Sequence, residues 1–453
     1  MRLITLLAGV IPTLLVASAM AQGRAQPQKP LMKEFIGINV HTVQFDPKLY
    51  APVTRMVRDY HPYMWDVDDK PGTATSFPMA KHIGWKDDSG KFRSWNRKVD
   101  WKELYGEWVK MGYDIDATIQ IEAVAYKDWP DRQKNLTEYG KAFAGYFGPS
   151  HANLVTSAEI GNEPAGNKKY TPEQYKEVFR IMARALREGD PKLKIVSCAV
   201  QAGKADGYCQ PIDVLKGESA LYDVINLHQY ALLKGWPSFE RTFPEDPRFR
   251  FIGILEDAIA WRDQNAPGKP LWLTEFGYDA SSKQPAPNNK DWKDCTDLQQ
   301  AQWIVRSFLA LSAIDIERAY LYFFNDGDSP SFHASSGITR NLEPKMSYWA
   351  MAHLYQSLGD YRLNATIEKD AKGAYVFEFV NGKDPKKLIW VAWSPTGSNL
   401  ELQKDLKLPG KLVKAERMPT AKDEKTAVTL APDDKGSARA QLTESPLYIW
   451  IEK

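Results

Sequence analysis

The chain has 453 residues, 43% of them hydrophobic and 26% charged, which is typical of a globular protein long enough for more than one domain. Lys and Arg (59) nearly balance Asp and Glu (57), so no field of one sign favours nucleic acid or a membrane surface as a partner. The balance instead favours an uncharged or weakly charged ligand. Fifteen Trp exceed the needs of an ordinary core, and we expect some of these rings to face a ligand.

The N-terminus has the features of an export signal. Arg2 precedes an apolar run from Leu3 to about Val16, and Ala19-Met20-Ala21 is a small-x-small cleavage site. A membrane anchor is the alternative, but Pro12 interrupts the run and the run is short for a span. We therefore predict a signal peptide over residues 1–21, a linker over 22–34, a secreted or periplasmic protein, and no membrane span after cleavage.

Three cysteines are compatible with an oxidising compartment and at most one disulfide. Cys198 lies in the strand-like run KIVSCAV and is expected to be buried, whereas Cys209 and Cys295 are loop residues and the better candidates for a bridge. Their spacing does not resemble a zinc site, so no metal and no cofactor are predicted.

Short apolar runs alternate with amphipathic stretches over residues 35–358, which is the pattern of βα units around a parallel sheet. Eight runs predict a (β/α)₈ barrel with some long loops. The predicted strands are 35–40, 55–58, 113–121, 154–161, 193–200, 223–230, 270–276 and 319–324.

One helix can be read closely between the fourth and fifth runs. Thr171 is its expected N-cap, Pro172 its first residue, Gln174 completes a capping box, and Gly189-Asp190-Pro191 ends it. Further helices are expected at 250–263 and 297–313.

The character of the chain changes after Leu358. The runs 374–380, 387–393, 411–418, 426–430 and 446–452 are rich in β-forming residues and are separated by Gly, Pro, Asn and Asp clusters. They predict a small antiparallel β-sandwich over residues 359–453.

The active site of such a barrel lies at the carboxyl ends of its strands, and two carboxylates fall there. Glu163 follows the fourth run and Glu275 closes the seventh, while His228 and Tyr230 end the sixth and Arg58 ends the second. Two facing carboxylates are what cleavage of a glycosidic bond requires, one as proton donor and one as nucleophile or base.

Their surroundings predict different roles. Glu275 leaves an apolar strand where Arg58 and the Tyr230 hydroxyl could hold it ionised, whereas Glu163 lies beyond a Gly-Asn turn and could reach a leaving group. Asn162 would donate to a sugar hydroxyl beside the reacting carbon. We expect the two carboxylates to lie about 5 Å apart.

Asn-Glu-Pro after the fourth strand and Thr-Glu-Phe-Gly at the seventh resemble the retaining (β/α)₈ glycoside hydrolases often called clan A. The segment GITRNLEPKMSYWAMAHLYQSLG and the closing TESPLYIWIE resemble members with a β-sandwich behind the barrel, such as the family that includes bacterial β-xylosidases. The resemblance implies Glu163 as acid/base, Glu275 as nucleophile, a covalent intermediate and retention at the anomeric centre. The chain departs from it at two strand ends, with Gln120-Ile121-Glu122 in place of a His and Phe323-Phe324-Asn325 in place of a Trp.

Several residues have both a functional and a structural interpretation. Arg58 could pair on the surface with Asp59 or Asp66, and His228 could be a structural histidine beneath the site. Of the loop aromatic residues, Trp65 and Trp236 are candidates for stacking on sugar rings, as is Phe324 at the eighth strand.

The sequence thus predicts an exported retaining hydrolase acting as a monomer on β-glycosidic bonds of a poly- or oligosaccharide. A non-catalytic sugar-binding protein on the same scaffold is the alternative. A metal-dependent barrel hydrolase is disfavoured because Asn39-Val40-His41 offers no His-x-His, and a serine hydrolase because no Gly-x-Ser-x-Gly occurs. Sugar identity and endo or exo action stay open.

Overall fold

The computed structural model describes residues 28–41, 47–67, 75, 77–81, 83–86, 92–94, 98–203 and 205–453. The predicted signal peptide and residues 22–27 of the predicted linker lie outside the described residues. Within them, no helix combines the length and the apolar character needed to cross a bilayer.

Eight parallel strands of the described chain close into a barrel, which confirms the predicted fold class. Each strand pairs with the next in the chain, the last pairs with the first, and the two-residue strand β8 (Gln210–Pro211) is added beside β7. The barrel strands are β1 (Ile36–Val40), β2 (Met56–Pro62), β5 (Asp114–Gln120), β6 (Ser157–Ile160), β7 (Lys194–Gln201), β9 (Val224–His228), β10 (Leu271–Phe276) and β11 (Arg318–Leu321).

Helices cover most of the barrel. The predicted cap of α6 is confirmed, because the Thr171 hydroxyl accepts from the Gln174 amide and the Gln174 side chain accepts from the Thr171 amide. Between β7 and β9 the described chain has no α-helix, and its one helical segment there is a 3₁₀ turn, Ile212–Leu215. The helices are α1 (Met32–Phe35), α2 (Pro47–Tyr50), α3 (Tyr63–Asp66), α4 (Trp101–Lys110), α5 (Arg132–Phe147), α6 (Pro172–Gly189), α7 (Phe251–Asn265), α8 (Asp297–Ser312) and α9 (Met346–Leu358).

The amino-terminal mouth of the barrel is filled by large side chains. Trp272 and Tyr320 are buried there in one cluster with Met56, Val196 and Val224. A β-carbon on Gly37 would lie 2.3 Å from the Tyr320 ring, so only glycine leaves room for it. This mouth is therefore a packed core, and the opposite mouth is left for chemistry.

The C-terminal region forms two antiparallel sheets with a core of their own. Strands β15, β18 and β20 escape sequence prediction because their exposed faces are polar, as in LQKDLK. The predicted strand 426–430 is wrong, since only Ala427 pairs there, in an isolated bridge to Glu416. The strands are β15 (Tyr361–Lys369), β16 (Tyr375–Asn381), β17 (Lys387–Trp393), β19 (Lys411–Arg417) and β21 (Leu447–Glu452) in one sheet, and β18 (Leu402–Lys407) and β20 (Ser437–Leu442) in the other.

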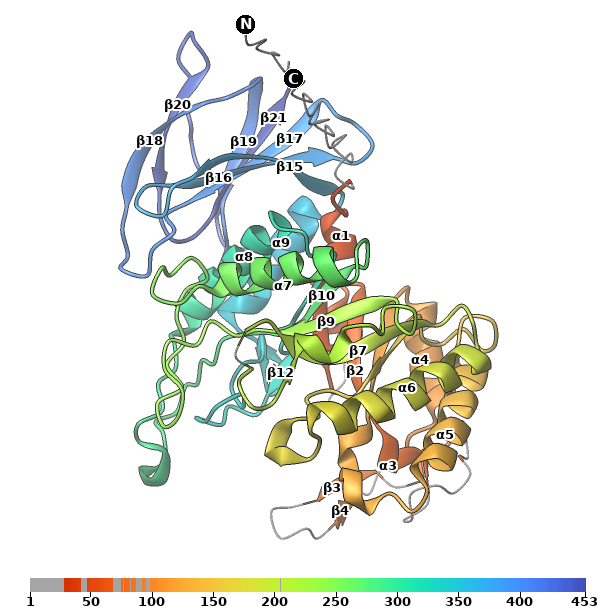
Figure 1. The fold of residues 1–453 in the computed structure, drawn as a ribbon. Helices are drawn as coiled ribbons and strands as arrows, with labels where there is room; N and C mark the ends of the chain where they lie inside the picture. The colour runs from red at the N-terminus through yellow and green to blue at the C-terminus, as the bar shows by residue number, and fades with distance from the viewer. Residues whose placement is uncertain are drawn as a thin grey trace, which may run out of the picture.

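This sandwich packs beside α8 and α9 (Figure 1). The Glu245 carboxylate joins the two parts, accepting from Arg306 of α8 at 3.0 Å and from the Trp393 indole of β17 at 2.7 Å. Arg306 and Glu245 are both fully buried, and Arg306 also donates to the Thr396 carbonyl at 2.9 Å. The barrel and the sandwich therefore share a buried charged contact.

The predicted linker is wrong for its described part. Met32 begins helix α1 and is fully buried, and Lys33 forms an ion pair with Asp360 at 2.7 Å. The apolar side chains of Met32 and Phe35 pack in the main hydrophobic core and thereby fix this segment.

The small hairpin β3 (Gly84–Lys86) and β4 (Phe92–Ser94) lies on the far side of the barrel from the sandwich (Figure 1). Three more two-residue strands, β12 (Asn325–Asp326), β13 (Thr339–Arg340) and β14 (Glu343–Pro344), form a small sheet in the segment between β11 and α9.

Candidate active site

The two candidate carboxylates meet at the carboxyl mouth of the barrel. Glu275 is the fifth residue of β10, and His228 ends the adjacent strand β9. The two residues are paired in register across these strands. Glu163 follows β6 by three residues. Side chains from three strand ends thus converge, as the barrel geometry predicts.

A tight turn brings Glu163 to this point. Gly161 has φ of +86°, a conformation that favours glycine, and it separates the end of β6 from Asn162 and Glu163. The buried carboxylate of Glu122 then accepts from the backbone amides of Asn162 at 2.9 Å and Glu163 at 3.3 Å. The turn is therefore held by a side chain from the neighbouring strand end.

Glu275 is surrounded by hydrogen-bond donors. Its Oε1 accepts from Arg58 Nη1 at 2.8 Å and from the Tyr60 hydroxyl at 2.6 Å, and its Oε2 accepts from the Tyr230 hydroxyl at 2.7 Å. The contacts predicted with Arg58 and Tyr230 are confirmed. Burial opposes ionisation, but the charges of His228 and Arg58 and the two phenol hydrogen bonds lower the pKa of Glu275 to about 2.

Glu163 has a different environment. Its side chain is 24% exposed, against 6% for Glu275, and its Oε1 lies 2.9 Å from His228 Nδ1. Burial raises the pKa of Glu163, the His228 hydrogen bond opposes this, and the nearby charge of Glu275 raises it further. Of the two carboxyl groups, Glu163 is therefore the one that keeps its proton to higher pH.

The distances from one imidazole nitrogen limit how far apart the carboxyl oxygens of Glu163 and Glu275 can lie. His228 Nδ1 lies 2.9 Å from Glu163 Oε1 and 3.5 Å from Glu275 Oε2. These two oxygens can be no further apart than the sum of those distances. That limit falls just below the range of about 6.5–9.5 Å that an inverting mechanism uses to fit water between its carboxyl groups.

Arg58 lies beneath the site and not at its surface. The side chain is fully buried, and its guanidinium binds both oxygens of Glu159 as well as Glu275. Nη2 also donates to Asn162 Oδ1 at 2.8 Å. The predicted substrate contact for Arg58 is therefore wrong, because its donors are used by protein acceptors, and so is the alternative pairing with Asp59 or Asp66.

Asn162 keeps one group for a ligand. The side-chain oxygen Oδ1 of Asn162 accepts from Arg58, which orients the side chain. The side-chain nitrogen Nδ2 has no hydrogen-bond partner among the described residues. The side chain is half-buried beside Glu163. Its predicted contact with a sugar hydroxyl stays a prediction.

His228 acts on the carboxyl groups and not on the substrate surface. The residue is 1% exposed, Nδ1 faces Glu163, and Nε2 lies 3.1 Å from the Thr274 hydroxyl. Both ring nitrogens are thus occupied by protein groups, so its predicted role as a substrate contact is wrong and the structural interpretation holds.

Two of the three predicted stacking residues are buried. Trp65 is 5% exposed, its indole donates to the Gly84 carbonyl at 3.0 Å, and its ring stacks near Trp101. Phe324 is 1% exposed and packs edge-on against Tyr50. These rings stabilise the hydrophobic core, so their assignment as substrate-binding residues is wrong.

Trp236 is 77% exposed and ends a run of aromatic contacts. It meets Phe239, which stacks on Phe332 at 4.0 Å, and the sequence neighbour of Phe332, His333, meets Tyr230 at 4.6 Å. Tyr230 in turn donates to Glu275. Aromatic side chains therefore extend from the nucleophile candidate to an exposed indole.

Sequence reasoning missed four polar residues of the site: Asn39, Tyr60, Glu122 and Glu159. Tyr60 belongs to β2 and follows Arg58, the predicted end of that strand. Glu159 belongs to β6 and precedes the predicted end of its strand. Asn39 supports Arg58 by accepting from Nη1 at 2.7 Å. The sequence feature that could have identified them is the presence of polar residues at inward positions of otherwise apolar barrel strands.

Cys209 and Cys295, the better candidates for a disulfide, do not form one, since all three cysteines are free and buried. Cys295 donates to the Asp279 carbonyl at 3.1 Å, whereas Cys209 belongs to the loop that precedes β8. Chain position outside a strand did not indicate how deeply either thiol is buried.

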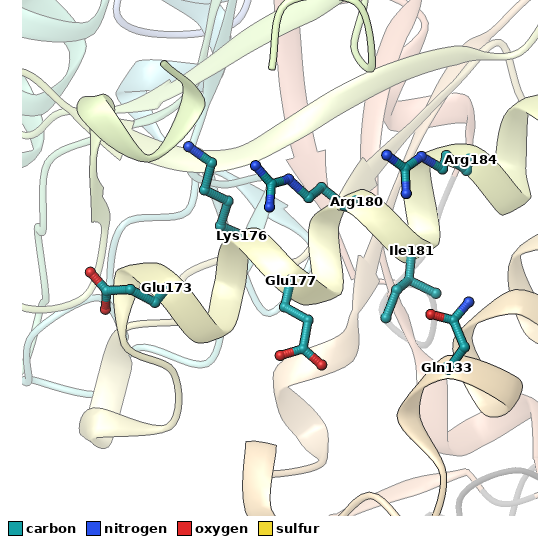
Figure 2. Close-up of a pocket in the computed structure, with 7 residues that line it drawn as sticks. All are labelled: Gln133, Glu173, Lys176, Glu177, Arg180, Ile181 and Arg184. Atoms are coloured by element: carbon teal, nitrogen blue, oxygen red, sulfur yellow. The ribbon is translucent and has the colours of Figure 1, made fainter. Parts of the chain in front are cut away.

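A hollow on the outer face of α6 is a separate feature (Figure 2). Two of its three cations are paired with Glu218, Arg180 at 2.6 Å and Lys176 at 3.2 Å, and it contains none of the residues around Glu163 and Glu275. It is lined by Gln133, Glu173, Lys176, Glu177, Arg180, Ile181 and Arg184.

No family model matches the chain, and no curated protein matches it in sequence. Solved structures do match it. A family 39 glycoside hydrolase from the gut symbiont Bacteroides cellulosilyticus has a TM-score of 0.66 at 17% identity, with 94% of this chain and 83% of that chain covered.

A glucosidase from Croceicoccus marinus has a TM-score of 0.63 at 14% identity, with 94% of this chain and 97% of that one covered. A family 51 alpha-L-arabinofuranosidase from Bifidobacterium longum has a TM-score of 0.60 at 14% identity, with the same coverage of 94% and 97%. At such identities the likeness shows the fold alone. The predicted resemblance to clan A glycoside hydrolases is confirmed at that level: this chain has their barrel-and-sandwich fold.

Proposed function

We propose that the protein is an exported retaining glycoside hydrolase that cleaves β-glycosidic bonds of a poly- or oligosaccharide with Glu163 and Glu275. One observation carries the proposal. Two carboxyl groups share a single imidazole nitrogen, and their surroundings shift their pKa values in opposite directions. A proton donor and an ionised nucleophile at adjacent positions are the two parts that this reaction needs.

In the first step, Glu163 gives its proton to the glycosidic oxygen as the Glu275 carboxylate attacks the anomeric carbon. The bond from that carbon to the leaving oxygen breaks, and an ester bond to Glu275 forms. In the second step, the Glu163 carboxylate takes a proton from water, the water oxygen attacks the same carbon, and Glu275 leaves as a carboxylate. Two displacements at one carbon retain its configuration.

The buried groups position this pair. Arg58, Tyr60 and Tyr230 hold the Glu275 carboxylate with three hydrogen bonds, so its attacking oxygen keeps one orientation without reorganisation. His228 Nδ1 lies 2.9 Å from Glu163 Oε1 and orients the Glu163 carboxyl group.

Carbohydrate as the substrate class is supported by the fold, since the similar structures include a glucosidase and an arabinofuranosidase. The near-neutral charge fits an uncharged sugar. The exposed Trp236 ring offers a flat apolar face, and a run of ring contacts through Phe239, Phe332 and His333 separates it from Tyr230, so we expect an extended ligand to use it. Export is supported by the apolar N-terminal run and its small-residue cleavage site.

The test is hydrolysis of a panel of aryl β-glycosides and plant, algal and bacterial polysaccharides, with the first anomer released observed by NMR. We expect the configuration of the substrate to be retained in that product. The Glu163→Gln, Glu275→Gln double variant measures contaminating activity, and Glu173→Gln, an exposed glutamate of α6, is the matched control. Initial release of the inverted anomer, or binding without turnover across the panel, would reject the proposal.

A further inference from the structure

Cys209 places a thiol beside the candidate acid. One ligand-type atom from each of Glu163, Cys209 and His228 lies within 4.8 Å of the other two. The three residues come from different segments, the turn after β6, the loop before β8 and the end of β9. A carboxylate, a thiol and an imidazole are all ligands that zinc accepts.

We propose that these three side chains form a binding site for a soft divalent cation, with Zn²⁺ as the reference ion, and that its occupation blocks hydrolysis. Binding itself is independent of the proposed function. The block rests on it, because it follows from the role of Glu163 as proton donor.

The tautomer of His228 supports the site. The Thr274 hydroxyl donates its single hydrogen to Asn226 Oδ1, so it accepts from His228 Nε2 at 3.1 Å. The proton of a neutral His228 is then on Nε2, and Nδ1 presents its lone pair towards Glu163 and Cys209. Metal-bound histidines usually donate their other ring N–H to a protein acceptor in this way, which fixes the tautomer and the orientation of the ring.

The Cys209 thiol is available to a cation. It is 1% exposed and has no hydrogen-bond partner among the described residues, whereas the thiols of Cys198 and Cys295 donate to carbonyl groups. Its unused sulfur is therefore the distinguishing feature of the three cysteines.

The loop that carries this thiol is fixed by hydrogen bonds. Asp206 accepts from the Cys209 amide at 3.0 Å and from the Gln201 side chain at 3.0 Å. Gln201 also donates to the His228 carbonyl at 3.0 Å. One glutamine thus ties the loop of Cys209 to the strand of His228, which holds two of the three ligands at a set separation.

The dimensions and charge fit zinc. Ligand atoms of a tetrahedral zinc site lie about 3.3–3.8 Å apart, given bond lengths of about 2.0–2.3 Å. The His228 Nδ1–Glu163 Oε1 pair, at 2.9 Å, would have to open slightly, while the other pairs, which lie within 4.8 Å, would have to close to that range. The carboxylate of Glu275, 3.5 Å from His228 Nδ1, adds negative charge beside the site. Zinc would displace the protons of Glu163 and Cys209, so binding tightens as pH rises.

The consequence for catalysis is direct. An oxygen of Glu163 that binds a cation has no proton to give to the leaving group. An ion held between Glu163 and His228 also stands next to Glu275, where the anomeric carbon would have to come.

The test uses the full chain and Zn²⁺ alone. Equilibrium dialysis with metal analysis, at neutral pH and under thiol-protecting conditions, is expected to give one bound Zn²⁺ per chain, with Mg²⁺ not competing because it prefers oxygen ligands. Cd²⁺ is expected to add a thiolate-to-metal absorption band in the near ultraviolet. The hydrolysis rate is expected to fall to near zero as Zn²⁺ saturates the site.

Two variants and a control decide the assignment. Cys209→Ser is expected to abolish the Cd²⁺ band and to weaken Zn²⁺ binding by more than the roughly 10–100-fold that outer-shell changes cause. Thr274→Val, which removes the group that sets the tautomer, is expected to weaken binding within that range. Cys295→Ser, which removes a thiol outside the cluster, is expected to change neither.

Each other outcome overturns the proposal. Absence of stoichiometric binding, or binding that Cys209→Ser leaves unchanged in a variant with native thermal unfolding, rejects the site. Activation of hydrolysis by Zn²⁺, or full activity with the site occupied, rejects the block. A chain that binds Zn²⁺ through Cys209 but hydrolyses no glycoside rejects the proposed function and leaves the metal site standing.

Discussion

Glu275 and Glu163 lie beside the same imidazole nitrogen, yet the protein treats them in opposite ways. Glu275 is almost fully buried and accepts hydrogen bonds from Arg58, Tyr60 and Tyr230. Glu163 is partly exposed and has His228 as its side-chain partner. Burial alone would raise both pKa values, and the charges of His228 and Arg58, together with the hydrogen bonds from the two phenols, lower the pKa of Glu275 to about 2.

The two glutamates also differ in how their surroundings hold them in place. The residues around Glu275 are rigid and internal, with Arg58 fixed by Glu159 on its other side. Around Glu163, the Glu122 carboxylate accepts from two backbone amides and holds the turn, while the Glu163 side chain is 24% exposed. A nucleophile needs one fixed orientation, whereas an acid has to reach leaving groups of different size.

The largest effect should come from removing each carboxylate. Glu275→Gln is expected to lower kcat for all substrates by roughly 10⁴-fold or more, because no bond to carbon can form. Glu163→Gln is expected to cost roughly 10²–10⁴-fold with a poor leaving group and far less with a dinitrophenyl glycoside, which leaves without a proton. Steady-state rates across aryl leaving groups measure this. Equal losses of both variants on every leaving group would remove the distinction between the roles.

The buried support of Glu275 can be tested through stability. Arg58→Met leaves Glu159 without its cation and is expected to lower the free energy of unfolding by about 3–5 kcal/mol. Arg132→Met, which removes a partly exposed pair with Glu177, is the matched control and is expected to cost about 0–1 kcal/mol. Urea unfolding at neutral pH compares them. Similar losses in the two variants would contradict the buried network.

The pH dependence of kcat/KM should follow from the two pKa shifts. Activity needs Glu275 ionised, so it is lost as pH falls towards its pKa of about 2, and it needs Glu163 protonated, so it is lost as pH rises through a pKa above the ordinary glutamate value. Tyr230→Phe removes one donor to Glu275. It is expected to raise the acidic limb by about one pH unit, to lower kcat about tenfold, and to leave the alkaline limb in place. A shift of the alkaline limb alone would assign the limbs the other way round.

The smallest effect is expected at the rim. Trp236→Ala should raise KM for a long oligosaccharide by up to about tenfold, the equivalent of one lost aromatic contact, and should leave a small aryl glycoside unaffected. Trp261→Ala, which removes a tryptophan of helix α7 on the outside of the barrel, serves as the control. Equal changes for short and long substrates would mean that the indole binds no sugar.

The barrel, its strand order and the two carboxylates could be predicted because they are local patterns. Apolar runs mark the strands, Glu275 lies near the end of one such run, and Glu163 follows another after a short Gly-Asn turn. The supporting residues could not be predicted in the same way. Arg58 looks identical in sequence whether it faces a sugar or lies buried, and only its packing against Glu159 decides between them.

The aromatic residues illustrate the same limit. Trp65 and Trp236 both lie beside polar stretches of the sequence, yet one packs near Trp101 and the other is 77% exposed. Cys209 and Cys295 are the better candidates for a disulfide by sequence, yet Cys209 carries a free thiol beside Glu163 and His228. Contacts between separate strand ends depend on the closed barrel and are not visible as spacing in the sequence.

The most direct test of the account is to trap the first intermediate. A 2-fluoro glycoside with a good leaving group, made with the sugar that the panel identifies, should inactivate the enzyme and add one sugar per chain. Peptide mass spectrometry should locate that sugar on Glu275, in the segment that contains LWLTEFG. A sugar bound to Glu163 or to any other residue would contradict the assignment of Glu275 as the nucleophile.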